Sequence, residues 1–166
     1  LQLSPVTSFA ALTTSGFEDV LEIGRHMRRD VYGLHAERRS LLIRRSDRFG
    51  VLERVDARGN VVEPLDEARV AEVAREIARR EIPVVAIGFL NAFRNPVHEI
   101  RAREIFREVA PQLVVSISSE ISPEIREYER FSTTALNAML VPVVSNYVTN
   151  LRRRSAENGL SAPVLL

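Results

Sequence analysis

The second half of the chain alternates continuous apolar stretches with amphipathic ones, which is the pattern of strands and helices packed in layers. Residues 84–90 (VVAIGFL) form a nearly unbroken apolar run, as expected of a strand that is covered on both faces. Pro96 then opens an amphipathic segment that predicts a helix to about residue 110, and residues 113–117 form a second apolar strand. A strand, a helix and a strand joined by short loops predict a βαβ unit with parallel strands.

The first half predicts shorter elements around one regular helix. Residues 65–81 carry apolar side chains on one helical face, and Asp66 is placed to cap the N-terminus. Residues 51–63 form two β-prone runs separated by a turn at Gly59, which predicts a hairpin. The remaining predicted elements are short strands at 9–12 and 41–43, a turn at 13–16 and a helix at 17–27. Together these elements predict an α/β fold, with a parallel or mixed sheet and flanking helices.

A polar loop at 118–122 separates the second strand from a long amphipathic helix. Ser122 is a suitable N-cap and Pro123 fits the first helical position, so the helix is expected to begin there. Its apolar stripe is predicted to be core and to hold the helix against the body; it comprises Leu136, Met139, Leu140, Val143, Val144, Tyr147 and Leu151. Pro142 removes one backbone hydrogen bond, which predicts a kink or a helix start near it.

Polar loops follow both parallel strands, at 91–95 and 118–122. Ligands of open α/β sheets bind beyond the carboxyl ends of the strands, so candidate chemistry is sought there first. One hypothesis is that five side chains after the second loop face a cleft and contact a substrate: Glu129, Arg130, Thr133, Thr134 and Asn137. Hydroxyls inside a helix favour this hypothesis, because they weaken the helix unless they cap or contact something. The alternative is that the alternating charges of 126–130 form a solvated face.

His98 lies in the first turn of the helix that begins near residue 96. It falls in line with the apolar positions of that helix, which predicts that it leans toward the core. No second histidine or carboxylate stands at the spacing of a metal site, so the sequence favours a structural histidine over a ligand or a base. No metal site is predicted. His26 and His35 have less support for a functional role than His98.

Composition excludes several classes of function. The chain has 166 residues, enough for one domain, and its formal net charge of +1 argues against strong binding to nucleic acid or to an anionic membrane. All 23 basic residues are arginine, so a Schiff-base lysine and a phosphate-loop lysine are excluded. The absence of cysteine excludes thiolate chemistry and disulfides and fits a cytoplasmic protein. No apolar run reaches the length of a membrane span.

No complete active-site motif stands in the sequence. It contains neither glycine-rich phosphate loop, GxxxxGKS/T or GxGxxG, and neither a GxSxG elbow nor an HExxH motif. Its seven glycines are isolated from one another and cannot build a phosphate cradle. By its own residues the chain is therefore an α/β domain without a complete active site.

Four collinear segments, however, resemble one family. They are TTSGFEDVLEIGR (13–25), ERVDARGNVVEPLD (53–66), VVAIGFLNAFRNPVHE (84–99) and SISSEISPEIREYERFSTTALNAMLVP (116–142). All are similar to the N-terminal region of the hydantoinase A/5-oxoprolinase family. That family includes ATP-dependent N-methylhydantoinase subunits, 5-oxoprolinases and related subunits of acetone and acetophenone carboxylases. The match covers nearly the whole chain but does not separate the members of the family.

The resemblance implies part of an actin-like, ribonuclease-H-like ATPase domain. It implies that the full-length protein uses ATP and Mg to activate a cyclic amide, such as hydantoin, N-methylhydantoin or 5-oxoproline, for hydrolysis. Phosphorylating an amide oxygen would make the carbonyl a good electrophile, so that water could open the ring. A hydantoinase B-like subunit is the implied partner. Two alternatives stay open: a module for subunit interaction, and part of a related carboxylase subunit.

The chain also departs from the family pattern. In the family an acidic, glycine-rich phosphate segment (DxGGTFTD-like) precedes the match at 13–25, and nothing like it occurs in residues 1–12. We therefore expect residues 1–159 to be a partial N-terminal region without the phosphate loop. Residues 160–166 are expected to open the following hydantoinase A domain with a strand. We expect this chain alone neither to bind the nucleotide tightly nor to hydrolyse ATP, and no catalytic residue is carried over from the family.

Overall fold

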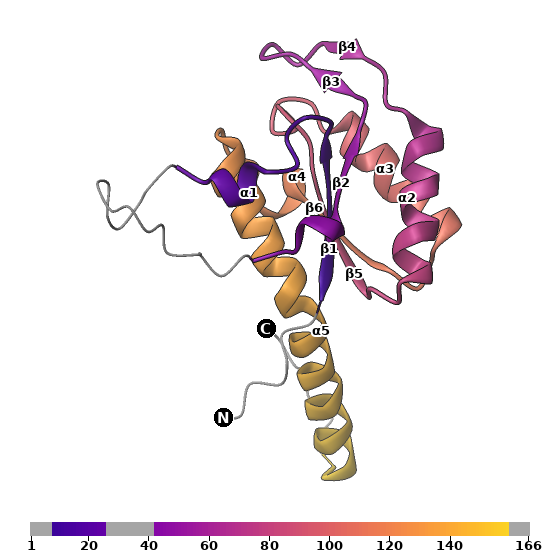
Figure 1. Cartoon of the computed structure of the whole chain (residues 1–166). Helices are drawn as coiled ribbons and strands as arrows, with labels where there is room; N and C mark the ends of the chain where they lie inside the picture. Colours follow the sequence, from indigo (N-terminus) through magenta and orange to yellow (C-terminus); the bar gives the residue numbers. More distant parts are fainter. Residues whose placement is uncertain (1–7, 26–41, 160–166) are drawn as a thin grey trace, which may run out of the picture.

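A computed structural model describes residues 8–25 and 42–159 (Figure 1). At its centre lies a four-stranded sheet in the order β2-β1-β5-β6. The strands are β1 (Phe9–Thr14), β2 (Arg48–Val51), β5 (Val84–Gly88) and β6 (Val114–Ile117). All three pairings are parallel, so the carboxyl ends of the four strands lie along one edge, the upper edge in Figure 1. The predicted parallel sheet is thereby confirmed.

Helices cover both faces of this sheet (Figure 1). On one face lie α2 (Glu67–Arg79) and α3 (Val97–Val109), and on the other lies α5 (Glu127–Glu157). Within β1 the side chains alternate, because Leu12 belongs to the core beneath α2 and α3, whereas Phe9 belongs to the smaller core beneath α5. The predicted unit of β5, α3 and β6 is confirmed, with its two strands parallel.

The start of α2 and the hairpin follow from local sequence. The Asp66 carboxylate accepts a hydrogen bond from the Arg69 N–H at 3.0 Å, which caps α2 as predicted. The hairpin pairs β3 (Arg54–Val55) with β4 (Val61–Glu63) in antiparallel fashion. The Asp56 carboxylate closes its turn through hydrogen bonds from Asn60, and these bonds lower the pKa of Asp56. Because β2 joins the main sheet, the hairpin is shorter than the predicted 51–63.

Three predictions in the first half are wrong in their bounds. The strand β1 extends to residue 14, into the predicted turn. Within the described residues the helix predicted at 17–27 is reduced to α1 (Val20–Ile23), because Gly24 at φ 56 ends it. Residues 42–43 form a bend instead of a strand, and the 3-10 turn η1 (Arg45–Asp47) follows. A hydrogen bond from the Arg48 guanidinium to the Ile43 carbonyl, 2.9 Å long, holds this bend.

Some predictions concern residues that lie outside the described ranges. These are residue 41 of the predicted strand, the end of the helix predicted at 17–27, His26, His35, and the segment 160–166 with its expected strand.

The connection after β6 differs from the predicted loop and helix start. Its first residues form the short helix α4 (Ser118–Ile121), and α5 begins only at Glu127. The buried Arg130 explains the later start, because its Nη1 donates to the Glu124 carbonyl at 3.0 Å and holds the intervening turn around the guanidinium. Arg126 ends that turn at φ 86, a left-handed conformation that cannot belong to the helix.

The two halves of α5 have different environments. Its first turns are buried through Phe131, Ala135 and Ala138, but its second half extends beyond the sheet (Figure 1). A helix of 31 residues spans about 46 Å, whereas a strand of six residues spans only about 20 Å. The prediction that the stripe is core is therefore wrong for five exposed residues: Leu136, Leu140, Val143, Val144 and Tyr147. Met139, another residue of the stripe, is partly buried and packs against the smaller core. The helix continues through Pro142, and no new helix starts there.

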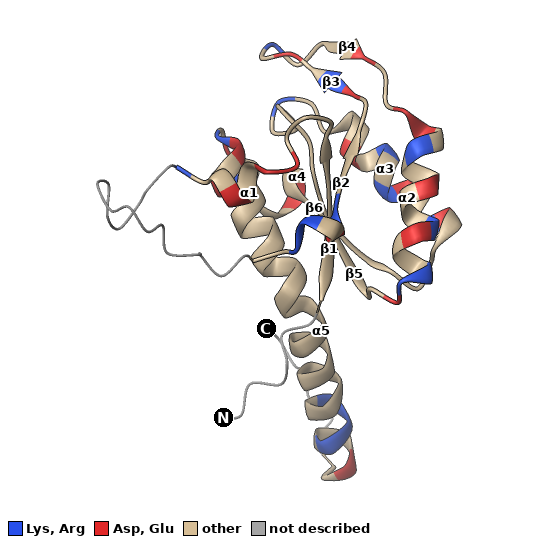
Figure 2. Ribbon diagram, in the orientation of Figure 1, with Lys and Arg blue, Asp and Glu red and all other residues tan. Residues whose placement is uncertain are grey.

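Charged residues lie on α1, α2 and α3, along the hairpin and at both ends of α5 (Figure 2). The middle of α5 carries none between Arg130 and Arg152. Among the residues that the structure describes, no helix is both long and apolar enough to cross a membrane.

Candidate functional site

Buried polar side chains collect at the carboxyl edge of the sheet. Thr14 ends β1, Glu53 follows β2, Ser118 follows β6, and His98 and Glu99 stand in the first turn of α3 after β5. Their exposed fractions range from 0% to 7%. The loops at 91–95 and 118–122 border this edge, as the sequence predicted. Because burying polar groups is costly unless they are hydrogen-bonded, their partners show what each group does.

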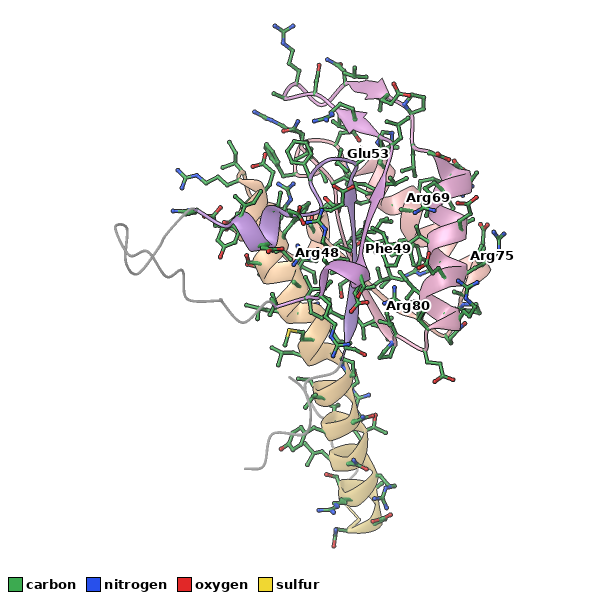
Figure 3. The ribbon with its side chains drawn as sticks, in the orientation of Figure 1. Arg48, Phe49, Glu53, Arg69, Arg75 and Arg80 are labelled. Carbon is green, nitrogen blue, oxygen red and sulfur yellow. The ribbon has the colours of Figure 1, made fainter. Side chains whose placement is uncertain are left out.

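The first group, the histidine cluster, consists of Thr14, Glu53 and His98. Glu53 Oε2 lies 2.8 Å from His98 Nδ1, and the Thr14 hydroxyl donates to Glu53 Oε1. The Leu90 N–H donates to the Thr14 oxygen at 3.1 Å, which leaves the hydroxyl hydrogen free to point at Glu53. Because carboxylate oxygens accept hydrogen bonds, this contact favours the tautomer with the proton on Nδ1 of His98. Figure 3 shows Glu53 at this end of the sheet, where β2 leads into the hairpin.

The second group, the arginine cluster, consists of Glu99, Ser118 and Arg130. Glu99 accepts hydrogen bonds from the Phe89 N–H at 2.9 Å, the Ser118 hydroxyl at 2.5 Å and the Ser119 N–H at 2.8 Å. Burial raises the pKa of Glu99, and the hydrogen bonds from Ser118, Ser119 and Phe89 offset only part of this rise. Its carboxyl group is thus fixed between the ends of β5 and β6.

Arg130 completes the arginine cluster with a side chain that is fully buried. Its Nε donates to the Ser118 hydroxyl at 3.0 Å, and its two terminal nitrogens donate to the carbonyls of Glu124 (3.0 Å) and Phe89 (2.7 Å). Burial lowers the pKa of Arg130, and the nearby charge of Glu99 acts in the opposite direction. These contacts tie the start of α5 to the ends of β5 and β6, which is the work of a structural clamp.

The five residues predicted to face a cleft do not gather around one cavity. Arg130 is buried in the arginine cluster. Glu129 lies near the surface and forms an ion pair with Arg25 of the segment after α1. The Asn137 side chain donates a hydrogen bond to the Ser116 hydroxyl in β6 at 3.2 Å. These three side chains therefore point to three different neighbours.

The two threonines of that set have a local explanation. Thr133 and Thr134 donate their hydroxyl hydrogens to carbonyls one turn earlier in α5, at 2.9 and 2.7 Å. Thr134 also lines a cavity of about 20 Å³ beside β1 and β5, together with Thr13 and Arg48. The Thr13 hydroxyl and Arg48 Nε have no hydrogen-bond partner among the described residues. A cavity of this size accommodates about one water molecule, not a substrate.

Sequence reasoning missed Thr14 and Glu53, whereas Ser118 lies in the polar segment 118–122 that it singled out. Glu53 was placed inside the predicted hairpin, although it stands two residues beyond the last residue of β2, Val51. The available signal was an acidic residue just past an apolar run, at the position where a parallel strand delivers its side chains to the carboxyl edge. That signal becomes visible only once the strand before it is recognised.

The two glycines of the sheet do not form a cradle for the phosphate groups of ATP. A phosphate cradle needs glycines whose backbone N–H groups are open to the ligand. Gly50 and Gly88, at the sheet, instead face the side chains of Glu18 and Phe131, and a methyl group at either position would overlap them. Within 8–25 and 42–159 no three acidic or histidine side chains are arranged to hold a metal ion. We therefore assign no step of ATP chemistry to these residues.

The chain belongs to the family described as the hydantoinase/oxoprolinase N-terminal region, whose model matches residues 5–110. The resemblance found in the four sequence segments is thereby confirmed.

Three relatives show how far the likeness extends. An uncharacterised protein of Methanocaldococcus jannaschii is 48% identical over 141 residues, which are 85% of this chain and 21% of the relative. The acetophenone carboxylase gamma subunit of Aromatoleum aromaticum is 37% identical over 148 residues, covering 81% of this chain and 20% of its own. The caprolactamase subunit alpha of Pseudomonas jessenii is 34% identical over 154 residues, covering 92% and 22%.

The likeness to caprolactamase extends to the fold. The crystal structure of the ATP-dependent caprolactamase from Pseudomonas jessenii matches 95% of this chain and 23% of that chain, with a TM-score of 0.82 and 33% identity. This likeness confirms the predicted α/β class and agrees with an actin-like domain. The chain spans about a fifth of the length of the relatives that it matches.

Proposed function

We propose that this chain is part of a subunit of an ATP-dependent enzyme that hydrolyses a cyclic amide, such as hydantoin, N-methylhydantoin or 5-oxoproline. The observation that carries the proposal is the likeness to the ATP-dependent caprolactamase, which holds over 95% of this chain in sequence order and in fold. A caprolactamase acts, by its name, on a lactam, and a lactam is a cyclic amide. The proposal places the enzyme in the cytoplasm.

Within this proposal the carboxyl edge of the sheet faces the substrate. The arginine cluster would hold α4 and the start of α5 in place, and the histidine cluster would present an imidazole at the same edge. ATP and Mg would be bound by other parts of the longer protein, because the glycines of the sheet are blocked and no metal-holding group lies among the described residues. Glu129, near the start of α5, stays a candidate contact of the substrate.

Two other functions have an observation in their favour. The likeness to the acetophenone carboxylase gamma subunit, 37% identical, favours part of a carboxylase subunit as the alternative. The exposed stripe on α5 favours a surface for another subunit, and a hydantoinase B-like subunit is the partner that we propose. The substrate of the longer protein distinguishes a carboxylase from a hydrolase, and the assembly of the subunits tests the interaction surface.

The test is phosphate release by the longer protein together with its B-like subunit. Hydantoin, N-methylhydantoin, 5-oxoproline, caprolactam, acetone and acetophenone would be supplied in turn. We expect release to depend on one of the cyclic amides. Release that depends only on a ketone supports the carboxylase alternative, and an intact complex that responds to none of the six contradicts the proposal.

A substitution at Glu129 separates the cleft from the interface. Glu129→Gln in the longer protein should lower turnover and leave the complex with the B-like subunit intact if this side chain contacts the substrate. Weaker association of the subunits, measured by size-exclusion chromatography, would instead assign Glu129 to the interface.

A further inference from the structure

The histidine cluster is a series of hydrogen bonds that ends at Nε2 of His98, an atom without a partner among the described residues. The Leu90 N–H donates to Thr14, Thr14 donates to Glu53, and Glu53 accepts from Nδ1 of His98. Both oxygens of Glu53 are therefore occupied, and its side chain is 0% exposed. In the part of the chain that the structure describes, Nε2 of His98 has no hydrogen-bond partner, and the side chain keeps 8% of its surface exposed.

This arrangement fixes the chemical state of the imidazole. The tautomer of a histidine is set by the hydrogen bond that its other nitrogen makes, and the Glu53 carboxylate holds the proton on Nδ1. Nε2 is then the nitrogen with the lone pair, able to accept a proton. The Glu53 carboxylate on the opposite side of the ring also fixes the orientation of the imidazole, as the aspartate of a Ser-His-Asp triad does for its histidine.

The position of this nitrogen matters as much as its state. Thr14, Glu53 and Leu90 come from the ends of three different strands, and His98 comes from the helix that follows β5. All of them converge at the carboxyl edge, where ligands of parallel α/β sheets bind.

We propose that Glu53 and His98 form a proton-transfer pair for a cyclic amide bound at the carboxyl edge, with Nε2 of His98 as the proton carrier and Glu53 as its positioning residue. This inference rests on the proposed function. The oxygen of a water molecule bonds to the carbonyl carbon while Nε2 takes one proton from that water. The ring C–N bond then breaks, and the same proton passes from Nε2 to the departing nitrogen. One water is consumed, and the imidazole returns to its neutral state.

The first test uses His98→Asn in the longer enzyme with its B-like subunit. An asparagine side-chain N–H can take the place of Nδ1–H, so Glu53 keeps its partner while Nε2 is removed. We expect kcat to fall about 100-fold or more, within the range of general acid–base catalysis, with KM and the melting temperature unchanged. Full turnover in His98→Asn would overturn the proposal.

His98→Gln is the matched control, because glutamine places its amide near the position of Nε2 and gives up the bond to Glu53. A purely structural role predicts that His98→Gln is the more harmful variant and that its loss follows the melting temperature. A role in proton transfer predicts that both variants lose turnover, and that only His98→Gln loses stability.

The second test needs no turnover, so it separates a failure of this inference from a failure of the proposed function. Ring-nitrogen NMR on the 15N-labelled chain of 166 residues, with the signals of His98 assigned through His98→Asn, reports which nitrogen carries the proton. We expect protonated Nδ1 and unprotonated Nε2 in the neutral ring, and a shift toward the opposite tautomer in Glu53→Gln. A wild-type ring with its proton on Nε2 would overturn the pair. If the longer enzyme turns over no cyclic amide, the proposed function fails and this measurement alone decides whether the pair is built as inferred.

Discussion

The histidine and arginine clusters share one edge of the sheet and meet at neighbouring residues, His98 and Glu99, yet they are built differently. The arginine cluster closes on itself, because Glu99 receives three donors and Arg130 donates to Ser118 and to two backbone carbonyls. The histidine cluster ends at a ring nitrogen that has no partner among the described residues. A closed buried network holds elements together, whereas an open one has a group left for a ligand.

The geometry of a helix explains how one turn serves both clusters. With 3.6 residues per turn, consecutive side chains point about 100° apart. His98 therefore reaches toward the end of β2 while Glu99 reaches toward the ends of β5 and β6. The first turn of α3 therefore contributes one residue to a structural site and the next residue to a candidate chemical site.

The largest expected effect on stability comes from removing the guanidinium of the arginine cluster. Arg130→Met should lower the free energy of unfolding by about 3–5 kcal/mol, because it leaves the Ser118 oxygen and the carbonyls of Glu124 and Phe89 without their charged donor, and each such loss costs about 1–3 kcal/mol. Urea denaturation of the 166-residue chain measures this loss. Arg69→Met, at an exposed site on α2 (Figure 3), is the matched control and should change stability by less than about 0.5 kcal/mol. Equal losses in the two variants would show that the arginine cluster is not a clamp.

A smaller loss of stability is expected from removing the Thr14 hydroxyl of the histidine cluster. Thr14→Val keeps the shape of the side chain but leaves the Leu90 N–H and Glu53 Oε1 each without a partner, at a cost of about 1–3 kcal/mol. Thermal or urea unfolding would detect it, with the exposed Thr133→Val as control. A loss no larger than that of the control would mean that the Thr14 hydroxyl does not support Glu53.

The pH dependence of Glu99 gives a third effect. Because burial raises its pKa in the folded chain above the usual 4.5, folding takes up a proton in the pH window between these two values. The contribution of Glu99 to stability therefore falls as the pH rises through that window, by at most about 1.4 kcal/mol for each pH unit. Measured by urea denaturation, the stability of the wild type relative to Glu99→Gln should decline from pH 4.5 upward. A relative stability that climbs over the same range would place the pKa of Glu99 below its usual value.

The smallest effect is expected on the exposed half of α5. Leu140 is 57% exposed, so Leu140→Ala should cost less than about 0.5 kcal/mol in the isolated chain. Leu12→Ala, in the main core, should cost about 2–5 kcal/mol. Comparable losses from both substitutions would restore the prediction that the stripe packs against the body.

The contrast between the clusters also shows what the sequence alone could predict. β5, β6, α2 and α3 follow from local periodicity and caps, and their parallel arrangement follows from the short connections between them. The fold class was accessible in the same way, whereas the family was accessible only through the resemblance of four sequence segments. The carboxyl edge was also predicted correctly, because it depends only on where two parallel strands end.

The side-chain clusters at that edge could not be predicted. Thr14, Glu53 and His98 are separated by 39 and 45 positions in the chain, so no local pattern relates them. The late start of α5 has the same origin, since it depends on the buried contact of Arg130 with Glu124 and not on the cap signal before it. The prediction that the stripe on α5 is core was wrong for another reason. A periodic apolar face predicts burial but does not identify the surface against which the face packs.

The most direct measurement compares Arg130→Met with His98→Asn by urea unfolding of the 166-residue chain, side by side with the wild type. If one cluster is a clamp and the other is open, Arg130→Met loses about 3–5 kcal/mol, because three acceptors lose their donor. His98→Asn, which keeps Glu53 paired, then loses less than about 1 kcal/mol. Similar losses in the two variants would contradict this division and make the histidine cluster a second structural lock.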